Sequence, residues 1–120
     1  MRDLWSKRLD TLGGMTKVWQ VQVAAPSEEA ALTLARTPVE ARLAAGGQVV
    51  GPVTSVFWHL GELGTGQEWQ AILKTTEDRY EQLERHLVEH HEWSNPEITA
   101  VPIAAGLAPY LDWVDRTTRN

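Results

Sequence analysis

Hydrophobic and polar residues alternate in several stretches of the chain, and this period of two predicts β-strands. In KVWQVQV, residues 17–23, the bulky apolar side chains occupy every second position and glutamines lie between them, which is typical of a strand with one buried face. The same pattern predicts a hairpin of strands over 48–60 and 67–76, joined by the turn GELGTG, and a last strand over 97–106. Gly51-Pro52 interrupts the second strand and indicates a bulge or a sheet edge.

Apolar residues three and four positions apart predict two longer helices. The first lies between the capping residue Ser27 and Gly46-Gly47, and we expect Pro38 to kink it because proline lacks a backbone donor. The second covers residues 76–91, and a short helix opening with Pro109 follows near the end of the chain. The stripes expected to face the core are Leu32, Ala35, Val39 and Leu43 in the first helix and Tyr80, Leu83 and Leu87 in the second.

The order of these elements predicts the α+β class. It matches the ferredoxin-like βαββαβ arrangement, an antiparallel sheet with two helices on one face, with a short C-terminal helix added. The opposite sheet face then has no cover. We expect that face to carry large apolar side chains such as Trp, Phe and Val, and therefore to be covered by further copies of the chain.

The length of 120 residues suits one domain, which we place at residues 15–120. Residues 1–14 are expected to form an N-terminal extension, a short amphipathic helix or arm. Trp5, Leu9 and Leu12 are spaced four and three apart there, as on one face of a helix. The charged residues scattered through this stretch do not match the apolar centre of a signal peptide.

Composition narrows the classes of function. The chain has no cysteine, so it offers no disulfide and no thiolate ligand, and we expect a cytoplasmic location. Its 16 acidic residues against 11 basic ones give a net charge of −5, which does not favour nucleic-acid binding. No apolar run reaches the roughly 20 residues that span a bilayer, so no membrane partner is expected.

Three of the four histidines, His86, His90 and His91, fall within six residues at the end of the second helix. His86 and His90 are four apart, so both lie on one helix face and are able to share a metal ion. A helix C-terminus also favours a cationic histidine by roughly 0.3 to 1 kcal/mol without any metal. Both interpretations stay open. The stretch HLVEH lacks the glutamate that follows the first histidine in metalloproteases, and no activated nucleophile is evident, so we do not expect an enzyme.

Three further charged residues are candidates for binding or assembly. Lys74 lies at a predicted strand-to-helix junction, where it either binds an anion or forms an intersubunit salt bridge. Glu68 and Glu97 lie on strands and either pair across an interface or supply a carboxylate to a histidine. The tryptophans, including Trp113, are expected to anchor the core and interfaces.

Several stretches resemble the CutA divalent-cation tolerance family. LAAGGQV, TSVFWHLGEL, EWQAILKTT, HHEWSNPEI and YLDW occur in the order and spacing of that family, and the resemblance covers residues 16 to 117. It implies a ferredoxin-like homotrimer whose sheets pack around a threefold axis. It also implies a non-enzymatic role in tolerance or binding of divalent cations, copper among them.

The resemblance carries over to individual residues. It implies metal ligands at His90 and His91, and it places the family's two cysteines on Val23 and Gly46. Imidazole and carboxylate ligands then remain, and these suit Cu(II), Zn(II) or Ni(II) rather than Cu(I). The other positions that match the family as ligand-pocket or interface residues are Lys74, Glu68, Glu97, Tyr110 and Trp113, with Trp93 where the family usually has tyrosine. Two alternatives stay open: a small-molecule sensing trimer like the nitrogen regulatory PII proteins, and a purely structural trimeric scaffold.

Overall fold

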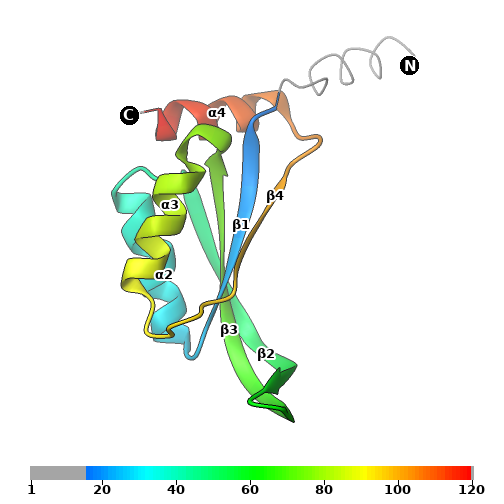
Figure 1. Cartoon of the computed structure of the whole chain (residues 1–120). Helices are drawn as coiled ribbons and strands as arrows, with labels where there is room; N and C mark the ends of the chain where they lie inside the picture. Colours follow the sequence, from blue (N-terminus) through cyan, green and yellow to red (C-terminus); the bar gives the residue numbers. More distant parts are fainter. Residues whose placement is uncertain (1–15, 120) are drawn as a thin grey trace, which may run out of the picture.

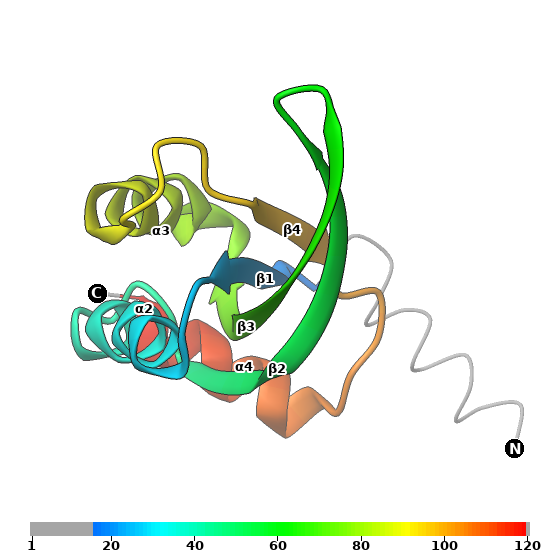
Figure 2. The same cartoon turned by 90° about the horizontal axis from the view of Figure 1, so that it is seen from below.

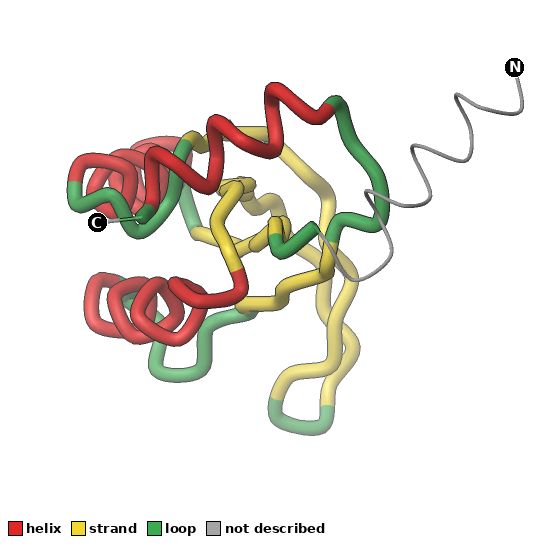
Figure 3. Tube along the Cα trace, turned by 90° about the horizontal axis from the view of Figure 1, so that it is seen from above, coloured by secondary structure: helices red, strands yellow, loops and turns green. Residues whose placement is uncertain are grey.

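The computed structural model describes residues 16–119. Its elements are β1 (Val18–Ala25), α2 (Glu28–Glu40), β2 (Gly46–His59), β3 (Glu62–Thr76), α3 (Glu77–His90), β4 (Ile98–Pro102) and α4 (Ala108–Thr118). The strands form one antiparallel sheet in the order β2-β3-β1-β4, and α2 and α3 lie side by side on one of its faces (Figures 1 and 3). The α+β class and the predicted element order are confirmed. The extension expected at residues 1–14 lies outside the described residues.

The main core fills the space between the sheet and the two helices. Val21 on β1, Leu73 on β3, and Leu83 and Leu87 on α3 have no exposed surface. The two leucines belong to the predicted stripe of the second helix. A smaller cluster forms where α4 crosses the end of the sheet at which β1 begins (Figure 1), and it contains Val18, Ala45, Leu111 and Val114.

Helix α2 buries most of the predicted stripe but not Leu32. Ala31, Leu34, Ala35 and Pro38 are its buried residues, whereas Leu32 is 43% exposed. Pro38 lies in the last turn, where it removes the backbone donor that would bond to the Leu34 carbonyl, but the helix continues two residues beyond it. The helix ends before Leu43, but Val39 and Leu43 pack, partly buried, against the core as predicted. The carbonyl of Pro38 accepts hydrogen bonds from Leu43 and Ala44, and these bonds close the end of the helix.

The turn predicted at GELGTG is also wrong. The turn consists of Leu60 and Gly61, with φ angles of 52° and 80°, as a two-residue hairpin turn of type I′ requires. Gly64 belongs to β3 and pairs with Phe57 of β2. A Cβ atom on Gly64 would lie 3.0 Å from the Phe57 ring, so glycine serves here to let the ring lie against the strand.

The early turn makes the hairpin longer than predicted. Residues 53–68, which we call the hairpin arm, extend beyond the rest of the fold (Figures 1 and 2). The register shifts between Val50 and Val53 at the base of the arm, and β2 is an edge strand. Both outcomes indicated by Gly51-Pro52 are therefore confirmed.

The sheet face opposite α2 and α3 is more polar than predicted. Trp19 lies on the helix side of β1, where its ring centroid is 5.3 Å from that of Tyr80, and Trp69 packs against the core from the same side. The expectation of tryptophan on this face is therefore wrong. The ladder places Gln20, Gln22, Gln48, Val50, Gln70, Ile72, Lys74, Thr99 and Val101 on the open face, and Phe57 lies on its continuation along the hairpin arm.

Candidate functional site

His86 and His90 lie on one face of α3, as their spacing predicts. Their rings stack with centroids 4.0 Å apart and planes 18° apart. His86 Nε2 lies 2.8 Å from Thr37 Oγ1 on α2, and the Thr37 hydroxyl lies 2.9 Å from the Thr33 carbonyl oxygen. The hydroxyl donates to that carbonyl, so we assign the Nε2–H of His86 as the donor to Thr37. His86 therefore links the two helices in its neutral form.

The protonation of His86 is expected to make folding stability depend on pH. Burial lowers its pKa below the ordinary value of 6.5, and the charge of His90 lowers it further, against a smaller opposing effect of Glu89. Below about pH 6.5 the unfolded chain then binds more protons at this position than the folded chain, so stability falls as pH falls toward the folded pKa. We expect His86→Gln, which keeps a donor for Thr37 but does not titrate, to lose less stability over this range.

The measurement is urea unfolding of wild type and His86→Gln at about pH 7.5 and about pH 5.5, either side of the histidine range. The His59→Gln variant, altered at the exposed end of the hairpin arm, is the control and should follow the wild type. A constant difference in urea midpoint between wild type and His86→Gln at the two pH values would show that His86 does not contribute.

His90 presents one unused ring nitrogen to solvent. Its Nδ1 donates to the backbone carbonyl of His86 at 2.8 Å, one turn earlier on the helix. This bond fixes the proton on Nδ1 and leaves the Nε2 lone pair without a partner among residues 16–119. Metal-binding histidines commonly show this arrangement, in which one nitrogen donates to a carbonyl and the other binds the ion.

His91 is adjacent in sequence but has different contacts. Its Nε2 donates to the carbonyl oxygen of Ala24 on β1 at 2.6 Å, and its Nδ1 accepts from the backbone N–H of Trp93 at 3.0 Å. The His91 and Trp93 ring centroids are 5.0 Å apart. Both nitrogens are therefore engaged, and the ring fixes the loop after α3 to the first strand. His86 and His90 come together, but His91 is directed elsewhere.

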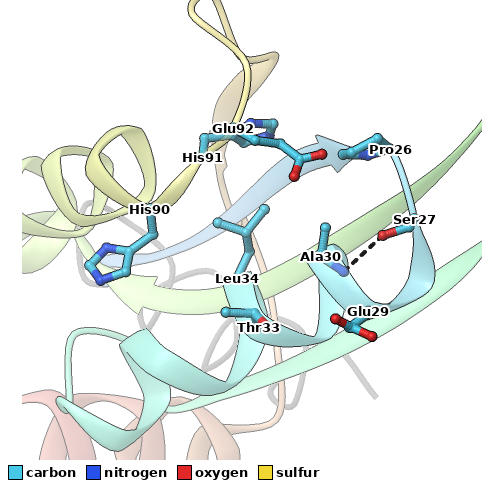
Figure 4. Close-up of a pocket in the computed structure, with 9 residues that line it drawn as sticks. All are labelled: Pro26, Ser27, Glu29, Ala30, Thr33, Leu34, His90, His91 and Glu92. Carbon is cyan, nitrogen blue, oxygen red and sulfur yellow. Dashed lines mark hydrogen bonds between the residues drawn. The ribbon is translucent and has the colours of Figure 1, made fainter.

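A hollow of about 240 Å³ lies between the end of α3 and the beginning of α2. His90, His91 and Glu92 line it from one side and Ser27 and Glu29 from the other (Figure 4). Figure 4 shows the His90 ring directed away from the carboxylates of Glu29 and Glu92, so these residues line one hollow but do not converge on a point in it. Within residues 16–119 no group of three or more histidine, aspartate and glutamate side chains is placed to hold a metal ion.

The sequence interpretation did not identify Glu29 and Glu92 as site residues. Acidic residues are common in the first turn of a helix, and this was a sufficient reason for Glu29 at its position. The sequence alone did not indicate that Glu29 and Glu92 line the same hollow. Glu92 directly follows the paired histidines, and that adjacency was the available signal. The His90 imidazole suits Cu(II), Zn(II) or Ni(II), but within residues 16–119 the carboxylates of Glu29 and Glu92 do not complete a metal site with it.

The other predicted site residues lie in three separate places. Lys74 pairs with Gly46 in the ladder, and a Cβ atom on Gly46 would lie 3.5 Å from the ring of Trp113. The Tyr110 ring lies 5.7 Å from that of Trp113, so Lys74, Trp113 and Tyr110 share one region beside α4. All three are partly or largely accessible, and Lys74 has no salt-bridge partner in the part of the chain described.

The remaining candidates lie away from α4. Glu68, at the base of the hairpin arm, accepts a hydrogen bond from the Ser55 hydroxyl at 2.8 Å. Glu97 precedes β4, and its carbonyl accepts from the backbone of Ala24, next to the contact of His91. None of the helices described is long and apolar enough to cross a membrane.

Comparisons with known proteins agree with this geometry. Residues 19–117 match the family model described as CutA1 divalent ion tolerance protein. The "Divalent-cation tolerance protein CutA" of Thermus thermophilus is 40% identical over 98 residues, covering 82% of this chain and 95% of that protein. The "Protein CutA 1, chloroplastic" of Oryza sativa is 33% identical, covering 96% of this chain and 65% of that protein.

A solved structure shows the same fold. It is described as the periplasmic divalent cation tolerance protein CutA from Archaeoglobus fulgidus. Its TM-score is 0.81 and its sequence identity 32%, with 84% of this chain and 98% of that chain covered. The match to the family model and the identity to the Thermus protein lead to one conclusion. The chain belongs to the CutA1 divalent ion tolerance protein family.

Proposed function

We propose that this protein is a homotrimer that binds a divalent transition metal, with Cu(II) bound most tightly, and that it contributes to tolerance of such cations without catalysing a reaction. The observation that carries the metal part of the proposal is the unused Nε2 of His90. His90 is also one of the residues that line a hollow together with Glu29 and Glu92. Imidazole and carboxylate ligands bind Cu(II) more tightly than Zn(II) or Ni(II).

The hairpin arm supports the trimer. Val56, Trp58 and Leu63 occupy one of its faces by strand alternation, and they are 65%, 74% and 63% exposed. An isolated two-stranded hairpin is marginally stable in water, and a large exposed apolar patch marks an interface. Contact with other copies of the chain would cover these side chains. The open sheet face, rich in glutamine, contributes less apolar surface than the arm.

Residue identity at the family's cysteine positions supports Cu(II) rather than Cu(I). Val23 is fully buried in the core, and Gly46 has no side chain. Neither position offers the thiolate that Cu(I) prefers. His90 is the principal ligand in this proposal. Water completes the coordination, while His86 and His91 hold the helix end in place.

Titration calorimetry with Cu(II) tests the metal site. We expect His90→Ala, in tag-free protein, to weaken Cu(II) binding by at least about tenfold, which corresponds to about 1.4 kcal/mol. Wild-type affinity should fall as pH falls through the histidine range, because protonated imidazole does not bind metal. His59→Ala, at the exposed end of the arm, is the matched control and should bind like the wild type. Equal affinity in His90→Ala and wild type would exclude this site.

The length of one turn and the Cu(II) titration distinguish the two alternatives from this proposal. A PII-like sensor would call for a long loop between the second and third strands, but Leu60 and Gly61 alone form that turn. The observation disfavours sensing through such a loop. If the protein is a structural scaffold, neither the wild type nor the His90→Ala variant will bind Cu(II), and both will be trimeric.

A cytoplasmic location is part of the proposal. It rests on the absence of cysteine, which suits a reducing compartment. The relatives vary in this respect: the rice protein is named as chloroplastic and the Archaeoglobus structure as periplasmic. Fractionation of the source cells, followed by detection of the chain, decides the location.

A further inference from the structure

A groove of about 310 Å³ lies between α4 and the start of β1. Figure 1 shows these two elements side by side at one end of the sheet. Val18 and Leu111, which are 3% and 8% exposed, form an apolar part of the lining, and Ala108 adds a small apolar side chain. Small-molecule pockets commonly measure about 300 to 1,000 Å³, so this groove suits a ligand of small size. It shares no residue with the hollow at His90.

One hydroxyl group in the lining has no hydrogen-bond partner. Thr76 is 5% exposed, and its side chain makes no capping bond at the start of α3 and no other hydrogen bond within residues 16–119. Its ladder partner is Val18, so it lies on the side of the sheet that α4 covers. Every fully buried side-chain oxygen or nitrogen in the described residues has a partner, so the Thr76 oxygen is open to the groove. A polar group in such a place calls for a partner from a ligand or from solvent.

Two contacts hold α3 and α4 together beside this hydroxyl group. The backbone N–H of Glu77, the first residue of α3, donates to the Lys17 carbonyl at 2.7 Å. The Nε–H of Arg79 donates to the Thr118 carbonyl at 2.5 Å. The start of α3 is thus fixed both to the residue before β1 and to the last turn of α4. Polar groups from three elements therefore line one groove.

Charged groups of both signs belong to the lining. They are Lys17, Asp78, Asp112 and Asp115. Asp115 pairs with Arg119, whereas the other three have no salt-bridge partner within residues 16–119. One ammonium group and two carboxylates are therefore available to a ligand. In the part of the chain described, no three histidine, aspartate or glutamate side chains are placed to hold a metal ion, so the aspartates do not indicate a metal site.

This lining selects for the charge of a ligand. A purely cationic ligand would be repelled by Lys17, and a purely anionic one by Asp78 and Asp112. A zwitterion carries one charge of each sign and matches both groups. An apolar side chain on the same molecule would cover Val18 and Leu111. An α-amino acid with an apolar side chain combines these three features in a small molecule.

We propose that the groove binds a free α-amino acid with an apolar side chain. The ligand carboxylate accepts hydrogen bonds from Lys17 Nζ and from the Thr76 hydroxyl. The ligand ammonium group donates to Asp78 and Asp112, and the apolar side chain packs against Leu111. This assignment depends neither on metal binding nor on the trimer.

Titration of the full ¹⁵N-labelled chain with L-leucine, followed by NMR, tests the proposal. We expect saturable shifts of the Val18, Thr76 and Leu111 amide signals up to about 10 mM ligand, a range that detects a Kd of about 1 mM. The signal of Gly61, at the end of the hairpin arm, should not shift. Isoamylamine lacks the carboxylate and isocaproate lacks the ammonium group, so each should bind at least about tenfold more weakly than L-leucine. The absence of saturable shifts with L-leucine would overturn the proposal, and so would equal affinity for either analogue.

Two variants and a control assign the binding to the groove. Asp112→Asn, at an exposed position of α4, should weaken L-leucine binding by at least about tenfold. Thr76→Val, which keeps the shape of the side chain, should weaken it by a smaller factor. Glu62→Gln, the same kind of change at the exposed end of the hairpin arm, should bind like the wild type. Wild-type affinity in Asp112→Asn would overturn the assignment, whatever Thr76→Val does to folding.

Discussion

A Trp58→Asp variant is expected to be a monomer of 13.4 kDa, whereas the wild type is expected to have three times that mass. Trp58 is 74% exposed on the hairpin arm and pairs across the strands with Leu63. In the proposed trimer both side chains are buried against another copy. A carboxylate at this position would lose its hydration without gaining a partner, a cost of several kcal/mol that recurs in each subunit.

Light scattering coupled to size exclusion measures the mass directly. Val88→Asp is the matched control, because Val88 is 51% exposed on α3 and lies away from the arm. It should keep the mass of the wild type. A wild type that is monomeric at micromolar concentration, or a Trp58→Asp variant that keeps the wild-type mass, would contradict assembly through the arm.

Leu83→Ala is expected to destabilise the folded chain by about 2 to 5 kcal/mol. Leu83 on α3 has no exposed surface and belongs to the core between the helices and the sheet. Truncation removes buried methyl groups and leaves a cavity that a close-packed interior fills only partly. The secondary structure should be retained at low denaturant.

Denaturant unfolding at one fixed protein concentration tests this expectation, since the stability of an oligomer depends on concentration. Val88→Ala is the control on the same helix and should change stability by less than about 0.5 kcal/mol, as exposed positions usually do. A cost for Leu83→Ala no larger than that of the control would place Leu83 outside the cooperative core.

The element order was predictable because strong local signals agreed with one another. Strict alternation fixed β1, and the spacing of Leu83 and Leu87 fixed α3 and its buried face. Ser27 caps α2 as predicted, with its hydroxyl accepting from the backbone of Ala30. Pro109 lies in the first turn of α4, where its fixed φ angle suits the start of a helix.

The hairpin arm was not predictable from local signals alone. Glycines at positions 61, 64 and 66 resembled a turn, but two of them lie within β3, and Gly64 makes room for the Phe57 ring. Whether a glycine reverses the chain or accommodates a ring depends on its cross-strand partner. The open sheet face carries no tryptophan from β1, since Trp19 alternates onto the helix side with Val21.

The candidate site was predictable only in part. The spacing of His86 and His90 placed them on one helix face, but the different roles of His90 and His91 arise from contacts distant in sequence. His91 donates to Ala24, a residue 67 positions earlier in the chain. Glu29 reaches the same hollow from another helix. Contacts between residues that are far apart in the chain produce no periodic pattern in a single sequence.

Pulsed electron paramagnetic resonance of the protein loaded with one equivalent of Cu(II) per chain identifies the groups that bind the metal. We expect nitrogen couplings from the imidazole of His90, and we expect His90→Ala to lose them while His59→Ala keeps them. The variants must remain folded and equal in mass to the wild type for the comparison. Unchanged imidazole couplings in His90→Ala would contradict the assignment of His90 as the principal ligand.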